Sequence, residues 1–219
     1  MGVFLFPPTC FSSVLKIELD KMENDLEGKI KQLMELEGEV KGVAIKSELD
    51  FILNREGREA LKKLEDKISG FGYDLKKEKI SDMKLYPLGL YGSIQLVVKE
   101  LFNYQEKEFQ EMGAFEAKMS LIMRLFMRYF VSLDVMANQV SKMWRTYFTT
   151  GELEVVEINK KERYIVADLK NFKIHKLQCN VLVGYFASVI QMVTGTKTTC
   201  EETKCLFSGD GFHRFLVKW

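Results

Sequence analysis

Residues 152–169, ELEVVEINKKERYIVADL, decide the fold class. In residues 152–158 and again in residues 163–169, apolar and polar side chains alternate, which is the period of a β-strand with one buried face. The polar turn Asn159-Lys160-Lys161 separates the two runs. The pattern therefore predicts an antiparallel hairpin.

A helix and a second hairpin are predicted beyond this stretch. Residues 177–194 return to helical spacing, and Gly195 follows as the stop. Residues 196–207 and 212–219 then read as two strands, joined by Ser208-Gly209-Asp210-Gly211, a turn rich in residues that accept positive φ. The C-terminal part is thus expected to alternate hairpin, helix and hairpin.

Helical spacing dominates the chain before residue 152. Asn54 is expected to cap one of these helices, a weak alternation over residues 73–80 suggests a short strand, and Pro87 biases Tyr86 toward extended backbone. The predicted class is α+β, with an antiparallel sheet of four to five strands packed against several helices and an N-terminal helical section. The helices are predicted over residues 16–37, 44–53, 56–68, 88–102, 103–112, 114–131 and 133–148.

The chain is expected to divide into three parts. Residues 1–21 are predicted to be a disordered leader, with Met22 as a candidate natural start, residues 22–83 an N-terminal helical section, and residues 84–219 the C-terminal domain. The leader has no basic residue before its apolar run, so it is a poor signal peptide. Charges interrupt the apolar stretch 119–140, so no membrane span is expected and the cytoplasm is the predicted location.

Composition argues against a nucleic-acid-binding protein. Lys and Arg number 32 against 31 Asp and Glu, which gives a formal charge of +1, and no basic run stands out. Nucleic-acid binding therefore loses most of its electrostatic basis. Hydrophobic residues make up 47% of the chain, the balance of a folded globular protein.

Three of the four cysteines lie in the last fifth of the chain, near a histidine. Cys179, Glu202, Cys205 and His213 offer thiolate, carboxylate and imidazole, which are the side-chain ligands of zinc, so they are predicted as a structural zinc site. Glu202 and Cys205 lie three residues apart, so a bulge or turn must bring them to one face, and Cys200 competes as a ligand. The alternative is that the cysteines are small buried apolar residues and that His213 lies at the surface.

The helices between residues 114 and 148 carry an unusually broad apolar surface. Flexible Met and aromatic side chains suit an adaptable pocket for an apolar ligand, although the same pattern is typical of a buried core. The predicted pocket residues are Phe115, Met119, Met123, Phe126, Met127 and Trp144.

The order of the four candidate ligands carries a resemblance to a known family. Cys179, Glu202, Cys205 and His213, followed by Gly209-Asp210 and the ending Phe215 to Trp219, resemble the C-terminal signature of the 4-vinyl reductase domain family over about residues 85–219. His213 stands where the aromatic-sensing members have cysteine. The resemblance implies a zinc-binding module for apolar or aromatic small molecules, with a fold shared by vesicle-tethering transport subunits and haem nitric-oxide-sensing domains.

The predicted function is non-catalytic binding or sensing of an apolar or aromatic small molecule. No nucleophile elbow, phosphate loop or helical pair of zinc histidines is visible, and no haem site is recognised, since His175 is expected in a solvated loop. The alternative is a homodimeric scaffold of the same fold without a ligand, and a homodimer is the expected assembly. A third hypothesis is thiol redox sensing through Cys200 and Cys205.

Overall fold

The computed structural model describes residues 25–119 and 132–219. The predicted leader, residues 1–21, lies outside this range, as do parts of the helices predicted over residues 16–37 and 114–131. The candidate pocket residues Met123, Phe126 and Met127 also lie outside the described residues.

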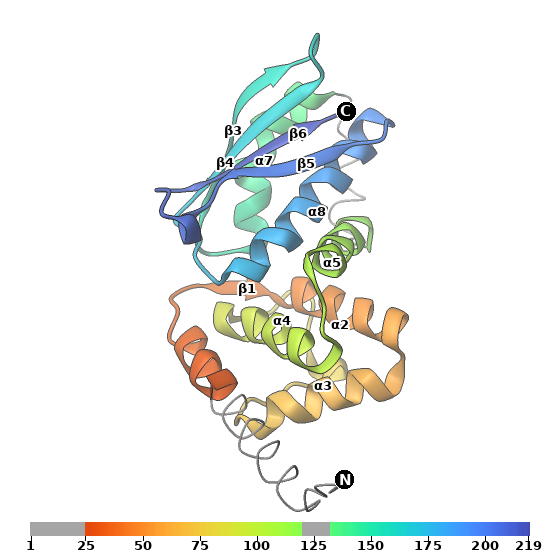
Figure 1. Ribbon diagram of the computed structural model, residues 1–219, viewed down its shortest axis with the longest axis vertical. Helices are drawn as coiled ribbons and strands as arrows, with labels where there is room; N and C mark the ends of the chain where they lie inside the picture. The colour runs from red at the N-terminus through yellow and green to blue at the C-terminus, as the bar shows by residue number, and fades with distance from the viewer. Residues whose placement is uncertain (1–24, 120–131) are drawn as a thin grey trace, which may run out of the picture.

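A four-stranded antiparallel sheet forms the upper half of the molecule (Figure 1). Its strands run in the order β3-β4-β6-β5, which sets the two predicted hairpins side by side. On the central strands Leu169, Phe215 and Val217 are almost fully buried, so the alternating pattern decides which face meets the helices. The strands are β3 (Glu152–Asn159), β4 (Tyr164–Lys170), β5 (Thr199–Lys204) and β6 (His213–Lys218).

Two helices lie against one face of this sheet (Figure 1). Helix α7 (Leu133–Tyr147) begins after Ser132, whose side chain accepts a hydrogen bond from the Val135 amide. Helix α8 (Lys176–Thr194) ends at Gly195, which has the left-handed φ of 69° that favours glycine there. The predicted ends of these two helices are accurate to one residue.

The remaining elements form the lower half of the molecule. The two-stranded pair β1–β2 connects it to the sheet half through the bridge between Val40 and Phe148. The elements are a helix over residues 25–34, β1 (Glu39–Lys41), α2 (Gly42–Glu56), α3 (Arg58–Gly70), β2 (Leu85–Pro87), α4 (Leu88–Phe102) and α5 (Glu106–Met119), with 3-10 turns η1 (Lys77–Lys79) and η2 (Leu206–Ser208). The predicted α+β class, with its sheet of four to five strands, is confirmed.

One continuous cluster of buried apolar side chains runs through both halves. It includes Ile30 and Leu49 in the lower half and Phe215 in the sheet. Strand β1 lies before residue 83 and pairs with β2, which lies after it. The division at residue 83 remains a prediction.

Three local predictions are wrong. Asn54 does not cap a helix, because α2 continues through it to Glu56 and its side-chain amide donates to the Asp50 carbonyl. The break comes at Gly57, where φ is 88°. Residues 73–80 form no strand, and the two helices predicted on either side of residue 113 are the single helix α5.

Helix α5 continues through Gly113, which lies where α5 crosses α8 at close range. A Cβ atom at Gly113 would lie 1.8 Å from the Val181 carbonyl oxygen of α8, and one at Gly184 would lie 1.8 Å from the Gln110 carbonyl oxygen of α5. No real Cβ approaches so closely. The two backbones are therefore in direct contact, and the position of α8 depends on both glycines.

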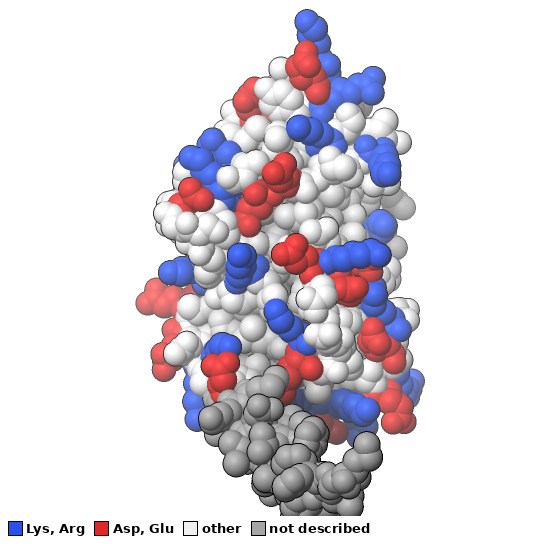
Figure 2. Space-filling model, in the orientation of Figure 1, with Lys and Arg blue, Asp and Glu red and all other residues white. Residues whose placement is uncertain are grey.

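Acidic and basic side chains are interspersed on the face of the molecule that Figure 2 shows. One described helix, α8, is long and apolar enough to cross a membrane by length and composition. Half of its apolar window is buried inside the protein, where it packs against α5 and the sheet. This is the packing of a core helix.

Candidate functional site

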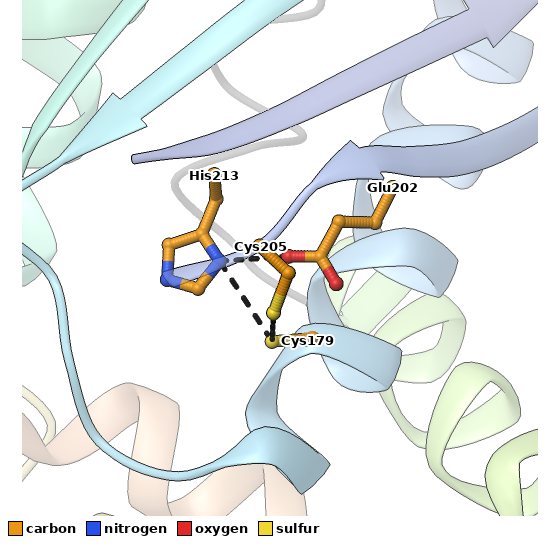
Figure 3. Close-up of side chains that lie close together, drawn as sticks. All are labelled: Cys179, Glu202, Cys205 and His213. Atoms are coloured by element: carbon orange, nitrogen blue, oxygen red, sulfur yellow. Dashed lines mark hydrogen bonds and ion pairs between the residues drawn. The ribbon is translucent and has the colours of Figure 1, made fainter. Parts of the chain in front are cut away.

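The four predicted metal ligands converge at the lower edge of the sheet (Figure 3). Cys179 lies in the first turn of α8, Glu202 in β5, Cys205 directly after β5, and His213 at the start of β6. Their ligand atoms all lie within 4.8 Å of one another. We call these four residues the cysteine cluster. Cys200, the competing ligand, is not among them.

A bulge brings Glu202 and Cys205 together. The register between β5 and β6 shifts between Glu202 and Lys204, which is the irregularity that their three-residue spacing requires. The loop after β5 is then fixed by the Cys205 amide, which donates to Asp210 Oδ2 at 2.8 Å.

The sulfur distances in the cysteine cluster suit a tetrahedral ion. Cys179 Sγ lies 3.8 Å from Cys205 Sγ and 3.8 Å from His213 Nδ1. Metal–sulfur bonds of about 2.3 Å at the tetrahedral angle place two sulfurs about 3.8 Å apart. His213 Nδ1 and Glu202 Oε1 are closer, at 2.7 Å. The two thiols therefore already have the spacing of first-row metal ligands.

The protons of His213 also favour a cation here. Its Nε2–H donates to the Phe172 carbonyl at 3.0 Å, which leaves a lone pair on Nδ1. That lone pair faces the Glu202 carboxylate, so the 2.7 Å contact requires either a proton or a cation between them. His213 is only 2% exposed, so this contact is shielded from solvent.

The thiols are not built as nucleophiles. Burial, followed by the charge of Glu202, raises the pKa of Cys179 far above its usual value, and burial raises the pKa of Cys200 to about 12. A reactive cysteine needs the opposite shift, toward a thiolate at neutral pH.

A cavity of about 330 Å³ lies between the sheet, α7 and α8. Its walls are mainly apolar, and the side chains that form them include Met136, Met143, Trp144, Ile165, Phe186 and Val189. At one side it also contacts Lys46 and Asp82, which form a partly exposed ion pair, so the cavity reaches solvent there.

The predicted pocket residues fall into three groups. Met119 and Trp144 line the cavity. Phe115 instead packs edge-on against Phe51, with ring centroids 5.6 Å apart. The other three lie outside the described residues.

The sequence analysis missed a polar wall of the same cavity. Gln95 Nε2 donates to Glu48 Oε1 at 2.5 Å and to Gln178 Oε1 at 2.6 Å, and the Tyr91 hydroxyl donates to Glu116 Oε2 at 3.3 Å. Gln178 Nε2 lies 3.5 Å from the Tyr91 hydroxyl and closes the series. We call these five buried residues the acid chain. Three of them, Tyr91, Glu116 and Gln178, line the cavity.

Burial shifts the acid chain toward its neutral form. It raises the pKa of Glu116 to about 8, and it raises the pKa of Glu48 well above the ordinary value, with the charge of Glu116 as the second cause. The sequence does hold a signal for these residues. Glu48 lies four residues from Ala44 and from Ile52, so it occupies the apolar face of α2.

His175 is not solvated as predicted. Its Nε2 lies 2.9 Å from the Gly92 carbonyl oxygen, and its Nδ1 is buried without a partner among the described residues. Burial lowers the pKa of His175 to about 4. The neutral ring therefore helps to fix the start of α8 against α4.

The arrangement of the helices and the sheet is similar to that of solved H-NOX proteins. A Shewanella oneidensis H-NOX protein in the Fe(II)NO state is 13% identical, with a TM-score of 0.64 over 81% of this chain and 98% of that chain. The unliganded Fe(II) H-NOX protein from K. algicida is 11% identical, with a TM-score of 0.56 over 81% and 95%. At these identities the likeness shows the fold alone.

Searches by sequence find nothing comparable. No family model matches the chain, and no curated protein matches it. The shared fold with haem-sensing domains agrees with one part of the predicted resemblance. Membership of the 4-vinyl reductase domain family itself remains a prediction.

The predicted zinc cofactor is wrong by this comparison. The metal in the titles of the matched structures is Fe(II), and a further match, with a TM-score of 0.52, concerns haem redox potential and porphyrin distortion. The metal of the matched structures is thus iron and not zinc, and we withdraw zinc.

Haem does not fit the residues of this chain either. The sequence holds two histidines, and neither lines the cavity: His175 contacts Gly92, and His213 belongs to the cysteine cluster. No described cysteine lines the cavity. The cavity therefore offers no imidazole or thiolate to a haem iron, and we assign no haem chemistry.

Proposed function

We propose that this protein binds an apolar or aromatic small molecule in the cavity between α8 and the sheet, as a sensor without catalytic activity. The observation that carries this proposal is the 330 Å³ cavity itself. Its volume lies within the range of about 300 to 1,000 Å³ that is common for ligand pockets. A protein core is normally packed without voids of this size.

Two further features support the proposal. The walls combine Met and aromatic side chains, which adapt to the shape of an apolar ligand. The Lys46 and Asp82 side offers a route from solvent. The raised pKa values of the buried thiols agree with a non-catalytic role, and a cytoplasmic location remains part of the proposal.

The test is binding of ethylbenzene, measured by ligand-observed NMR. Ala167 lines the cavity from β4, so Ala167→Phe fills the space and is expected to abolish binding. The control is Ala60→Phe, which adds the same ring to half-buried Ala60 in α3, away from the cavity, and is expected to bind normally. Both variants are first checked for folding by circular dichroism. Failure of ethylbenzene to bind the folded wild-type protein would overturn the proposal.

We also propose that the cysteine cluster binds a divalent transition-metal ion that ties α8 to the second hairpin. The convergence of four ligand atoms within 4.8 Å supports this. The probe is cobalt(II), whose thiolate charge-transfer absorption is expected on titration into the wild-type protein and absent in Cys205→Ser. Elemental analysis of the purified protein then identifies the resident ion, and an absence of both signals contradicts the proposal.

The competing proposal is a ligand-free homodimeric scaffold of the same fold. A scaffold without a ligand predicts that ethylbenzene does not bind the wild-type protein and that Ala167→Phe alters only the assembly. If Ala167→Phe changes the mass measured by light scattering while ethylbenzene does not bind the wild-type protein, the scaffold is favoured over the sensor.

A further inference from the structure

The acid chain is short of hydrogen-bond donors. Three buried oxygens of the acid chain have no partner among the described residues: Glu48 Oε2, Gln95 Oε1 and Glu116 Oε1. All three are acceptors when the two carboxyl groups are ionised, which is the form that a cation in the cavity would favour. The side-chain donors of Tyr91, Gln95 and Gln178 already donate to other residues of the acid chain. A buried acceptor without a donor costs about 1–3 kcal/mol, so three in one place call for an explanation.

The same residues are short of positive charge. Glu48 is fully buried and Glu116 is 6% exposed, and the charge of Glu116 opposes ionisation of Glu48. Within residues 25–119 and 132–219, no Lys, Arg or His forms an ion pair with either carboxyl. Two buried acids are therefore held together without a cation.

Of the three acceptors, Glu116 Oε1 belongs to a residue that lines the cavity, whereas Glu48 and Gln95 lie behind the wall. Tyr91, Glu116 and Gln178 reach the cavity wall from α4, α5 and α8, so their oxygens converge from three helices. The rest of the wall is mainly apolar. A molecule that satisfies both regions has an apolar body and one end that carries several N–H donors and a positive charge.

We propose that the ligand of this cavity is an apolar or aromatic amine, bound as its ammonium ion against Glu116, with Tyr91 and Gln178 as further acceptors. This inference rests on the proposed function, because it names the chemical class of that ligand. An ammonium group supplies three donors and a full charge. A hydroxyl group supplies one donor and no charge, so it can donate to only one of Glu116, Tyr91 and Gln178.

Glu48 has a supporting part in this arrangement. It does not line the cavity but reaches Gln178 through Gln95, with both contacts at 2.6 Å or less. By accepting a hydrogen bond from Gln95, Glu48 orients the amide group that donates to Gln178 Oε1. Glu48 is thus a positioning residue, and Glu116 is the group that contacts the ammonium.

The experiment compares three ligands of one shape at pH 7: 2-phenylethylamine, 2-phenylethanol and ethylbenzene. An aliphatic amine has a pKa near that of lysine, about 10.4, so it is protonated at this pH. We expect 2-phenylethylamine to bind at least tenfold more tightly than the other two, as measured by calorimetry. In Glu116→Gln, which keeps the size of the side chain, this preference is expected to disappear while ethylbenzene still binds.

Two controls keep the test decisive. Glu48→Gln is the second variant, in case Glu116→Gln does not fold, and it is expected to reduce the preference for the amine by a smaller factor. Ala167→Phe is expected to abolish binding of all three compounds. Amine binding that survives in Ala167→Phe would come from another site and would overturn the inference.

The remaining outcomes separate the two proposals. If ethylbenzene binds but the amine binds no more tightly than the alcohol, the ammonium inference fails and the proposed function stands. If the preference persists in both Glu116→Gln and Glu48→Gln, the assignment to the acid chain fails. If none of the three compounds binds the folded wild-type protein, both proposals fall together.

Discussion

The acid chain and the cysteine cluster meet on consecutive residues of α8, Gln178 and Cys179, yet they bury polar groups in opposite ways. The acid chain is a linear series of hydrogen bonds between four helices, in which neutral side chains separate two acids. The cysteine cluster instead points four ligand atoms at one small volume, from a helix and a hairpin. The cysteine cluster therefore suits a small cation, whereas the acid chain suits a group that donates several hydrogen bonds along the cavity wall.

The comparison shows how geometry selects a partner for buried charge. Convergent lone pairs about 3.8 Å apart leave room for one ion and nothing larger. Lone pairs that lie along a cavity wall leave room for an organic molecule. Both regions depend on the position of the first turn of α8. The variants below test first this shared dependence and then each region by itself.

Gly184→Ala should break both regions at once, with the largest effect. The added methyl group would overlap the Gln110 carbonyl of α5, so α8 must move, and we expect a loss of about 4 kcal/mol in the free energy of unfolding. Urea denaturation measures it. Gly28→Ala is the matched control, because a Cβ there meets nothing within 4 Å and alanine favours the helix. Equal stability of the two variants would contradict the crossing described here.

Cys179→Ala should remove metal-linked stability and leave the acid chain intact. An ion present at one hundred times its dissociation constant contributes about 2.7 kcal/mol. A chelator is therefore expected to lower the unfolding midpoint of the wild-type protein but not that of Cys179→Ala. Cys200→Ala, which changes a cysteine outside the cluster, should respond to the chelator as the wild-type protein does. A chelator effect that persists in Cys179→Ala would show that the ion binds elsewhere.

The pH dependence of stability should report on the acid chain alone. The pKa of Glu116 is raised to about 8, so its contribution to stability is complete below its ordinary pKa of 4.5 and is lost as the pH rises toward 8. His175 has a pKa lowered to about 4, so it works in the opposite direction up to its ordinary value of 6.5. The net fall is therefore expected between pH 6.5 and 8, and Glu116 contributes at most about 1.4 kcal/mol per pH unit to it.

Glu116→Gln should flatten this fall, because an amide does not titrate. Unfolding in urea at a series of pH values measures the slope. A slope that is identical in the wild-type protein and in Glu116→Gln would assign the pH dependence to Glu48, whose pKa is raised for the same reason.

Tyr91→Phe should have the smallest effect, about 0.5 kcal/mol. Its hydroxyl makes only long contacts, at 3.3 Å to Glu116 and 3.5 Å to Gln178, and long hydrogen bonds contribute little. Tyr104→Phe removes a hydroxyl that lies 2.8 Å from Glu56 and is expected to cost more. Thermal unfolding ranks the two, and a larger loss in Tyr91→Phe would mean that the acid chain acts as a connected unit.

Much of the fold could be predicted because it follows from local periodicity. The two hairpins and the helices α4, α7 and α8 are strongly patterned. Helix α4 begins directly after Pro87, α7 ends at the extended residue Phe148, and α8 ends at Gly195. The errors came where tertiary contact overrides a local signal. Gly113 reads as a helix stop, and only the neighbouring backbone of α8 explains why α5 continues through it.

The two candidate sites differed in how visible they were. The cysteine cluster could be predicted because its residue types are rare and their order is distinctive. The acid chain could not, because Glu and Gln are common on helix surfaces and its five members lie on four helices far apart in sequence. The charged residue on the apolar face of α2, Glu48, was the available signal. Of the predicted pocket residues, Met119 and Trp144 line the cavity, whereas Phe115 packs against Phe51.

The contact between Gly113 and Gly184 also bears on how this chain can be aligned with proteins of similar fold. At 11 to 16% identity, side-chain similarity gives little guidance about which residues correspond. Two backbones that touch without side chains permit almost no substitution at either position, whatever ligand the protein has come to bind. A pair of glycines 71 positions apart (184 minus 113), one in each crossing helix, therefore gives a fixed point from which the rest of the alignment can be built.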